Sequence, residues 1–182
     1  MSRGFTLIEV VIVIALFVVV MLGVVQLYLV FGRIITQQSS SIDIALDSGA
    51  IIDAARNAGL QATHVVASHT FSGVTYNSGT TTVIFELPSI DSSGAIIPST
   101  FDYVGIYASS TQVYRVVDVA DGSSRVSGTK ILTDVLGALS FNYDSASFSA
   151  VASVTVDATT SAVVQGETAQ THLRGHIYLR NL

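Results

Sequence analysis

An unbroken apolar run near the N-terminus constrains this chain more than any other feature. Residues 10–32 contain no charged side chain, and at about 1.5 Å per helical residue they can cross a hydrocarbon core of about 30 Å. This segment is therefore predicted to be a transmembrane helix. Glu9 stands directly before it, and a carboxylate at mid-bilayer costs roughly 2.5 to 3.5 kcal/mol and usually marks a functional site with a partner. The partner of Glu9 is the question that the sequence raises.

The order of the N-terminal features is unlike that of a secretory signal. A secretory signal carries its cleavage site after the apolar core, whereas here Gly4 stands before it. Cleavage between Gly4 and Phe5 would remove only the leader MSRG and leave the hydrophobic helix attached. Arg3 and Arg33 flank the segment almost evenly and give little orientation signal. The polar remainder of the chain predicts one translocated domain, with the short N-terminus in the cytoplasm.

Residues 4–10, with the sequence GFTLIEV, resemble the processing motif of type IV prepilins and of the pseudopilins of type II secretion. The resemblance covers the leader and the first helix. It implies that a membrane-embedded prepilin peptidase cuts after Gly4 on the cytoplasmic face and that Phe5 is then N-methylated. It further implies that Glu9 pairs with the Phe5 amine of a neighbouring subunit inside a filament. That amine exists only after cleavage.

Two other interpretations of this region stay open. Glu9 would lie in the first helical turn, where a carboxylate complements the helix dipole by about 0.3 to 1 kcal/mol; this role is compatible with pairing. The N-terminal segment as a whole has the alternative of an uncleaved signal anchor. Gly23, inside the apolar run, fits either local melting of the helix or close helix packing.

Beyond Gly32 the helical period is predicted to continue in an amphipathic form and to end near Gly59, since glycine readily follows a helix in the left-handed conformation. The apolar residues recur at helical spacings and are expected to form the face that packs on a soluble domain. The residues of this predicted face are Ile35, Ile42, Leu46, Gly49 and Ile52.

From residue 61 onward the pattern changes to β-branched and alternating runs. Strands are predicted over residues 64–67, 82–87, 103–108, 113–117, 137–143, 151–157 and 172–179, with turn residues between them. The tract 130–139 has the alternative of a short helix or turn. One long helix followed by strands predicts an α+β fold with an antiparallel sheet on the helix. With the resemblance, this gives a pilin fold with a leader (1–4), a transmembrane and filament-core helix (5–32), its amphipathic continuation (33–59) and an extracytoplasmic β-rich head (60–182).

Alternation sets the register of two of these strands. Leu139, Phe141 and Tyr143 share one face, and Val154 and Val156 share a face of the next strand, as in half-buried strands. The tracts at residues 131–144, 152–158 and 176–181 together resemble the tail of minor pilins and of J-type minor pseudopilins. This second resemblance favours a minor subunit.

Beyond the N-terminal region, residues of the types that bind metals or catalyse reactions form no recognisable site. His172 and His176 share a strand face, but no third metal ligand stands at a suitable spacing. Catalytic-elbow and phosphate-loop signatures are missing, so the chain is not expected to be an enzyme or to hold a cofactor, metal or small-molecule substrate. A group of aspartates could include a calcium site but forms no EF-hand loop. These aspartates are Asp118, Asp121, Asp134 and Asp144.

The net charge of the chain limits the classes of partner that it is expected to bind. The chain has a net charge of −5 and no cysteine, and it lacks the basic patch of a nucleic-acid-binding surface. The expected partners are prepilin peptidase, other pilin or pseudopilin subunits and the inner (cytoplasmic) membrane. The expected location is single-pass in that membrane and then in a surface or periplasmic filament.

The expected function is a structural subunit of a type IV pilus or type II secretion pseudopilus, with a minor subunit favoured. The alternatives are a major pilin and a membrane-tethered adhesin or binding module.

Overall fold

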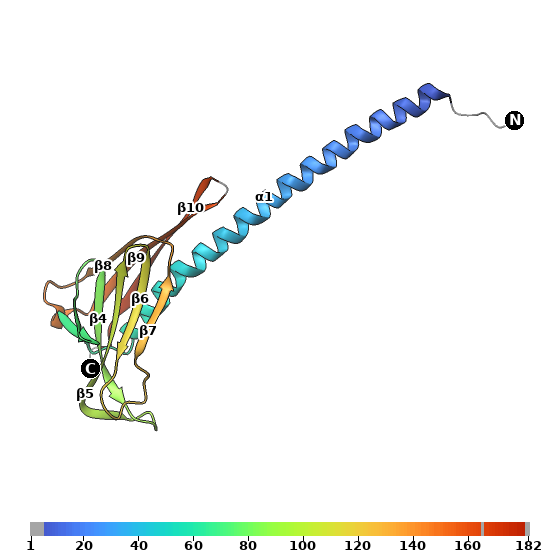
Figure 1. Ribbon diagram of the computed structural model, residues 1–182. Helices are drawn as coiled ribbons and strands as arrows, with labels where there is room; N and C mark the ends of the chain where they lie inside the picture. Colours follow the sequence, from blue (N-terminus) through green and yellow to red (C-terminus); the bar gives the residue numbers. More distant parts are fainter. Residues whose placement is uncertain (1–5, 165, 181–182) are drawn as a thin grey trace. The chain divides into compact units, whose positions relative to one another are not determined.

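A single long helix precedes every strand of the chain (Figure 1). The computed structural model describes residues 6–164 and 166–180. The chain divides into two compact units, residues 1–40 and residues 41–182, and helix α1 (Leu7–Gly59) begins in the first and ends in the second. We call residues 41–182 the head unit. The predicted long helix, over residues 5–32 and 33–59, is confirmed from Leu7 to Gly59.

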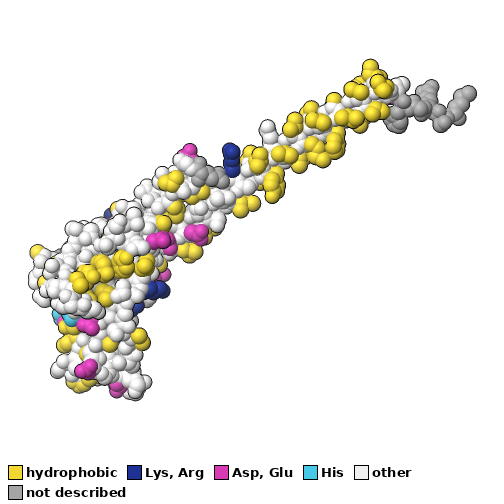
Figure 2. Space-filling model, viewed as in Figure 1, with side chains coloured by type: hydrophobic (Ala, Val, Ile, Leu, Met, Phe, Trp, Pro, Cys, Tyr) yellow, Lys and Arg dark blue, Asp and Glu magenta, His cyan; other side chains and the backbone are white. Residues whose placement is uncertain are grey.

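From Leu7 to Phe31 α1 is exposed at every position and, apart from Glu9, carries no charged side chain. It is long and hydrophobic enough to cross a membrane, with a mean hydropathy of 3.2 over its most apolar window. Hydrophobic side chains cover this part of the helix in Figure 2, whereas charged side chains gather on the rest of the molecule. The helix continues through Gly23 without interruption.

The strands of the head unit form three antiparallel sheets. A five-stranded sheet has the order β1-β4-β5-β6-β7, a three-stranded sheet has the order β10-β9-β8, and β2 and β3 form a separate hairpin. The predicted α+β class is therefore confirmed. The strands are β1 (His64–Val65), β2 (Ser68–Phe71), β3 (Val74–Asn77), β4 (Thr82–Ile90), β5 (Ile96–Ser109), β6 (Gln112–Asp118), β7 (Gly128–Thr133), β8 (Leu136–Tyr143), β9 (Ser153–Val164) and β10 (Glu167–Tyr178), with a 3₁₀ turn η1 (Phe148–Ala150) before β9.

Each predicted strand overlaps an observed one, but three strands were not predicted: β2, β3 and β7. The tract 130–139 forms neither a helix nor one long turn, because β7 ends and β8 begins within it. The alternation in β8 and β9 is confirmed, since Leu139, Phe141, Val154 and Val156 are all buried.

The packed face of α1 differs from the predicted one. Ile35, Ile42 and Leu46 are 60 to 66 % exposed, so the prediction was wrong for these three residues, whereas Ile52 of the predicted face is buried. The buried face contains small residues, which let strands approach the helix axis closely, whereas the prediction followed the largest aliphatic side chains. The buried residues of α1 are Ile44, Ser48, Ile51, Ile52, Ala55, Ala58 and Gly59.

Two glycines mark the closest approach between α1 and β10. A Cβ on Gly59 would overlap the Ile177 side chain, and a Cβ on Gly175 would lie 2.6 Å from Cγ2 of Ile52. The helix does end at Gly59 as predicted, but the φ angle of Gly59 is not in the left-handed region. Glycine is required there by packing rather than by the backbone conformation that the prediction invoked.

Two threonines join α1 to both large sheets. Thr160 of β9 donates its hydroxyl to the main-chain oxygen of Ile44 at 2.7 Å, and Thr133 of β7 donates to Oδ2 of Asp47 at 3.0 Å. Thr160 is fully buried and Thr133 is 4 % exposed. These bonds satisfy polar groups that would be costly to bury unpaired, and they set the position of the helix along the sheets.

Candidate functional site

The start of α1 is the site that the sequence singled out. Thr6 precedes the helix, and its main-chain N–H and hydroxyl both donate to Oε2 of Glu9, at 2.9 and 3.0 Å. The main-chain N–H of Glu9 in turn points at the Thr6 hydroxyl oxygen at 3.4 Å. This reciprocal arrangement is a capping box, which satisfies N–H groups that have no partner inside the helix.

The capping box gives Glu9 a local role beyond its interaction with the helix dipole. Its signal was present in the sequence as Thr-x-x-Glu before an apolar run, but the role of Thr6 was not recognised. Both Thr6 bonds go to one carboxylate oxygen, Oε2. Oε1 of Glu9 has no hydrogen-bond partner among residues 6–164 and 166–180, so the carboxylate keeps one acceptor free.

Gly4 and Phe5, the predicted processing and methylation residues, lie outside the described residues. What the structure shows of the predicted site is its helical side: Glu9 sits in the first turn of α1, at the beginning of an uncharged apolar stretch. A carboxylate in that position is poorly solvated once the helix lies in a membrane, and the Thr6 donors reduce that cost.

The other residues considered from sequence have ordinary polar partners. His172 and Arg174 both approach Oδ1 of Asp157, at 3.4 and 2.6 Å, and His176 shares a 2.9 Å hydrogen bond with the Thr155 hydroxyl. Within the described part of the chain, no three His, Cys, Asp or Glu side chains are grouped so that they could hold a metal ion.

The four aspartates weighed for calcium are likewise not gathered into one described metal-binding group. Asp118 lies 2.8 Å from Nε2 of His69. Asp144 accepts from the Ala152 N–H and the Ser153 hydroxyl, which ties the loop before β9 to that strand. The structure therefore gives these two side chains structural contacts in different parts of the head.

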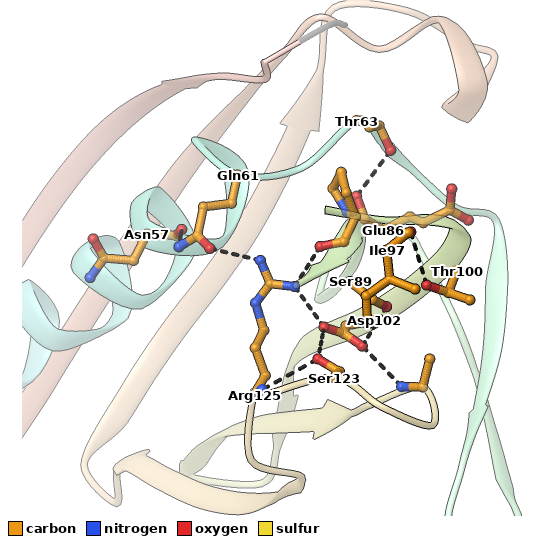
Figure 3. Close-up of polar contacts among 12 residues, drawn as sticks. Asn57, Gln61, Thr63, Glu86, Ser89, Ile97, Thr100, Asp102, Ser123 and Arg125 are labelled. Atoms are coloured by element: carbon orange, nitrogen blue, oxygen red, sulfur yellow. Dashed lines mark hydrogen bonds and ion pairs between the residues drawn. The ribbon is translucent and has the colours of Figure 1, made fainter. Parts of the chain in front are cut away.

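The most heavily bonded polar centre of the head was not singled out from sequence. Asp102 of β5 is fully buried and accepts from four donors, drawn in Figure 3. Oδ1 accepts from the Ser89 hydroxyl and the Ala120 N–H, and Oδ2 from the Ser123 hydroxyl and Arg125 Nη1, at 2.6 to 2.9 Å. Burial by itself would raise the pKa of Asp102, but these donors outweigh it and hold the pKa below its ordinary value.

Arg125 extends this centre to the end of the helix. Its Nη1 also donates to the main-chain oxygen of Pro88 at 2.6 Å, and its Nη2 donates to Oε1 of Gln61 at 3.0 Å. Gln61 then donates to the main-chain oxygen of Asn57 in the last turn of α1. The guanidinium thus donates to oxygen atoms of Pro88, Asp102 and Gln61 and connects the loop after β6 to the segment after α1 (Figure 3).

Sequence reasoning missed this centre because its members are far apart along the chain. Asp102 and Arg125 are separated by 23 residues, and Arg125 and Gln61 by 64, so no short motif joins them. The centre is a structural clamp, since every described polar group of it is already paired within the head.

The head and the helix together have the layout of the pilin fold: one long N-terminal helix packed through its C-terminal part against antiparallel sheets. Residues 1–25 match the family model described as the prokaryotic N-terminal methylation motif. The chain therefore carries the processing motif of type IV prepilins and pseudopilins and is type IV pilin-like. Comparison with curated proteins and with solved structures gave no match.

The motif and the apolar helix have two direct consequences. Proteins with this motif are processed by a peptidase and assemble with other pilin subunits. The apolar N-terminal helix fits anchoring in a membrane.

Proposed function

We propose that this chain is a structural subunit of a type IV pilus or a type II secretion pseudopilus. Prepilin peptidase removes residues 1–4 by cutting after Gly4, and Phe5 is then N-methylated. The subunit sits in the cytoplasmic membrane with its N-terminus inside and its head outside, and enters the filament through helix packing. The observation that carries the proposal is the single carboxylate, Glu9, at the start of the part of α1 that the match to residues 1–25 covers and that is otherwise uncharged.

In the filament, Glu9 pairs with the Phe5 amine of a neighbouring subunit. Thr6 occupies only Oε2 of Glu9, so Oε1 can accept from that amine while the capping box stays intact. A low local dielectric strengthens the attraction, but the desolvation of both charges offsets much of it. The pair therefore sets the register between subunits more than it adds net stability.

A minor-subunit role is the finer form of the proposal. Its support is the resemblance of the three tail tracts, which fall in β7 to β10 and the segments beside them. A major pilin is the second candidate, since the processing motif is shared. Subunit abundance in purified filaments separates the two: a minor subunit is expected at a small fraction of the total, and a chain that forms the bulk of the fibre would be a major pilin.

Mass spectrometry of the mature protein tests the proposal. The expected N-terminus is a methylated Phe5. A tethered adhesin or an uncleaved signal anchor would keep Met1, and a secretory signal would be cut beyond residue 32. Either result would refute the proposed function.

A further inference from the structure

Both large sheets of the head end in strands with an open side. The five-stranded sheet ends in β7 and the three-stranded sheet ends in β10. Residues 128–131 of β7 are all exposed, and so are Glu167, Thr168 and Gln170 of β10. Each strand pairs with one neighbour among the described strands, which leaves main-chain N–H and C=O groups on the other side able to pair with a further strand.

The beginning of β10 extends past the rest of its sheet (Figure 1). Strand β8 reaches only as far as Thr160 of β9, whereas β9 and β10 stay paired from Ser161–Gln170 to Val164–Glu167. We call these four residue pairs the β9–β10 arm; at about 3.3 Å per residue it is about 13 Å long. A two-stranded ribbon without a third strand is only marginally stable in water, so an added strand would stabilise it.

The two edges differ in charge. Lys130 of β7 lies directly opposite Arg115 of β6, and like charges in that position are unfavourable. Neither cation makes a salt bridge with an acid of the described chain. Glu167, the only acid of β10, likewise has no salt-bridge partner there, and Val164 lies opposite it. An acid brought beside Lys130 would relieve the repulsion between the two cations.

We propose that the β9–β10 arm of one copy adds to the free edge of β7 in a second copy, with Glu167 beside Lys130. Antiparallel pairing with Glu167 opposite Lys130 places Thr168 opposite Thr129 and Ala169 opposite Gly128, and main-chain hydrogen bonds join the two sheets across the interface. Because the two edges are different surfaces, each copy keeps one of each free, and the contact generates an open series rather than a closed pair. The inference rests on the proposed filament function in its major-pilin form, in which copies of this chain are neighbours, and names a head contact that accompanies the helix contacts.

The chain contains no cysteine, so any disulfide within it or between its copies joins introduced cysteines. In membranes that contain the assembled full-length chain, the double variant Lys130→Cys/Glu167→Cys is expected to give a ladder of disulfide-linked dimers, trimers and larger species on oxidation. Copies with Lys130→Cys mixed with copies with Glu167→Cys should give dimers only. The matched control replaces Lys130→Cys by Val74→Cys, at an exposed position on the separate β2–β3 hairpin, and should give monomers.

Two results would overturn the proposal. Cross-linking of Lys130→Cys with Glu167→Cys at the level of the Val74→Cys control would exclude the contact, and efficient dimers from Glu167→Cys alone would show that the arm pairs with itself. Charge reversal gives a second measure: Lys130→Glu and Glu167→Lys should each reduce cross-linking between cysteines at Thr129 and Thr168 several-fold, and their combination should restore it. A combination that does not recover the yield counts against the contact.

The same samples separate this inference from the proposed function. If Phe5 is methylated and the chain assembles but the cross-links are missing, only the arm contact fails. If Phe5 is not processed, the proposed function fails.

Discussion

Gly59 of α1 and Ile177 of β10 are in contact only because residue 59 has no side chain. A Cβ at this position would overlap Cγ2 of Ile177, whereas a Cβ on Gly49, ten residues earlier in the same helix, would meet nothing within 4 Å. The contact with β10 therefore requires a glycine at position 59, whereas no contact requires one at position 49.

Alanine substitutions at these glycines should act in opposite directions. Gly59→Ala is expected to lower the free energy of unfolding by about 1 to 3 kcal/mol, because Ile177 is β-branched and has little room to move. Gly49→Ala should raise it by up to about 1 kcal/mol through helix propensity. Denaturant titration of the full chain in detergent micelles, followed by circular dichroism, measures both. Equal effects would contradict the close approach of α1 and β10.

The Tyr143 hydroxyl should contribute measurably to head stability. It lies 2.9 Å from the main-chain oxygens of both Gly79 and Thr82, and burial raises its pKa. Tyr143→Phe leaves those oxygens without this donor and should cost about 1 to 2 kcal/mol. The control is Tyr178→Phe, because Tyr178 is 67 % exposed, and its cost should be near zero. Similar losses in the two variants would rule out a stabilising role for the Tyr143 bond.

Asp102 should make the head sensitive to acid. Its folded-state pKa is lowered, so its contribution to stability is fully present above the unfolded pKa of about 4 and is lost as the pH falls through the folded pKa. Asp102→Asn should reduce the free energy of unfolding at neutral pH by about 3 to 5 kcal/mol, because Arg125 loses its ionic partner. It should also flatten the acid limb of the stability profile.

The exposed Asp121 provides the control for this experiment. Asp121→Asn should leave both the neutral stability and the acid limb almost unchanged. Asp91 and Asp157, whose pKa values are also lowered, keep part of the acid limb in every variant. An Asp102→Asn profile parallel to that of the unsubstituted chain would show that Asp102 is not a source of the acid sensitivity.

The two roles of Glu9 can be separated by substitution. Glu9→Gln removes the charge but keeps a side chain that serves in a capping box, whereas Thr6→Val removes the capping hydroxyl and keeps the charge. If pairing with the Phe5 amine governs assembly, Glu9→Gln should abolish filament incorporation, and Thr6→Val should reduce it only in proportion to a capping loss of about 0.5 to 2 kcal/mol.

Filament yield with methylated Phe5 as the processing control measures the two effects. Asp53→Asn, at an exposed acid further along α1, is the matched charge control and should assemble normally. Assembly that is lost with Thr6→Val and kept with Glu9→Gln would assign the role of Glu9 to capping alone.

The sequence predicted those parts of the fold that depend on local patterns. The length of α1, the alternation of Phe141 and Val156 and the overall α+β order follow from helical and two-residue periods, and all three are confirmed. The packed face of α1 could not be read in the same way. It depends on which residues the strands can approach, and Ser48 and Ala58 pack there because they are small, while the larger Ile42 and Leu46 stay exposed.

The same difference between local and long-range contacts applies to the polar sites. Thr6 and Glu9 are three residues apart, and their capping box was legible in the sequence although it was not recognised. Asp102 and Arg125 meet only because β5 and the loop after β6 fold together. No short sequence spacing predicts such a pair. The β2–β3 hairpin, whose strands have four residues each, was also missed.

The bond between Thr160 and Ile44 joins residues 116 positions apart. Ribosomes make a chain from its N-terminus, so α1 is complete long before the strand that fixes it exists. Contacts at such separations slow folding, because the intervening chain must close a long loop first. The buried side of α1 must therefore stay without its final partners until β9 has been made. During that interval Ile44, Ile51 and Ile52 are exposed and can bind chaperones or aggregate. The length of the interval limits how quickly new subunits fold and become able to assemble.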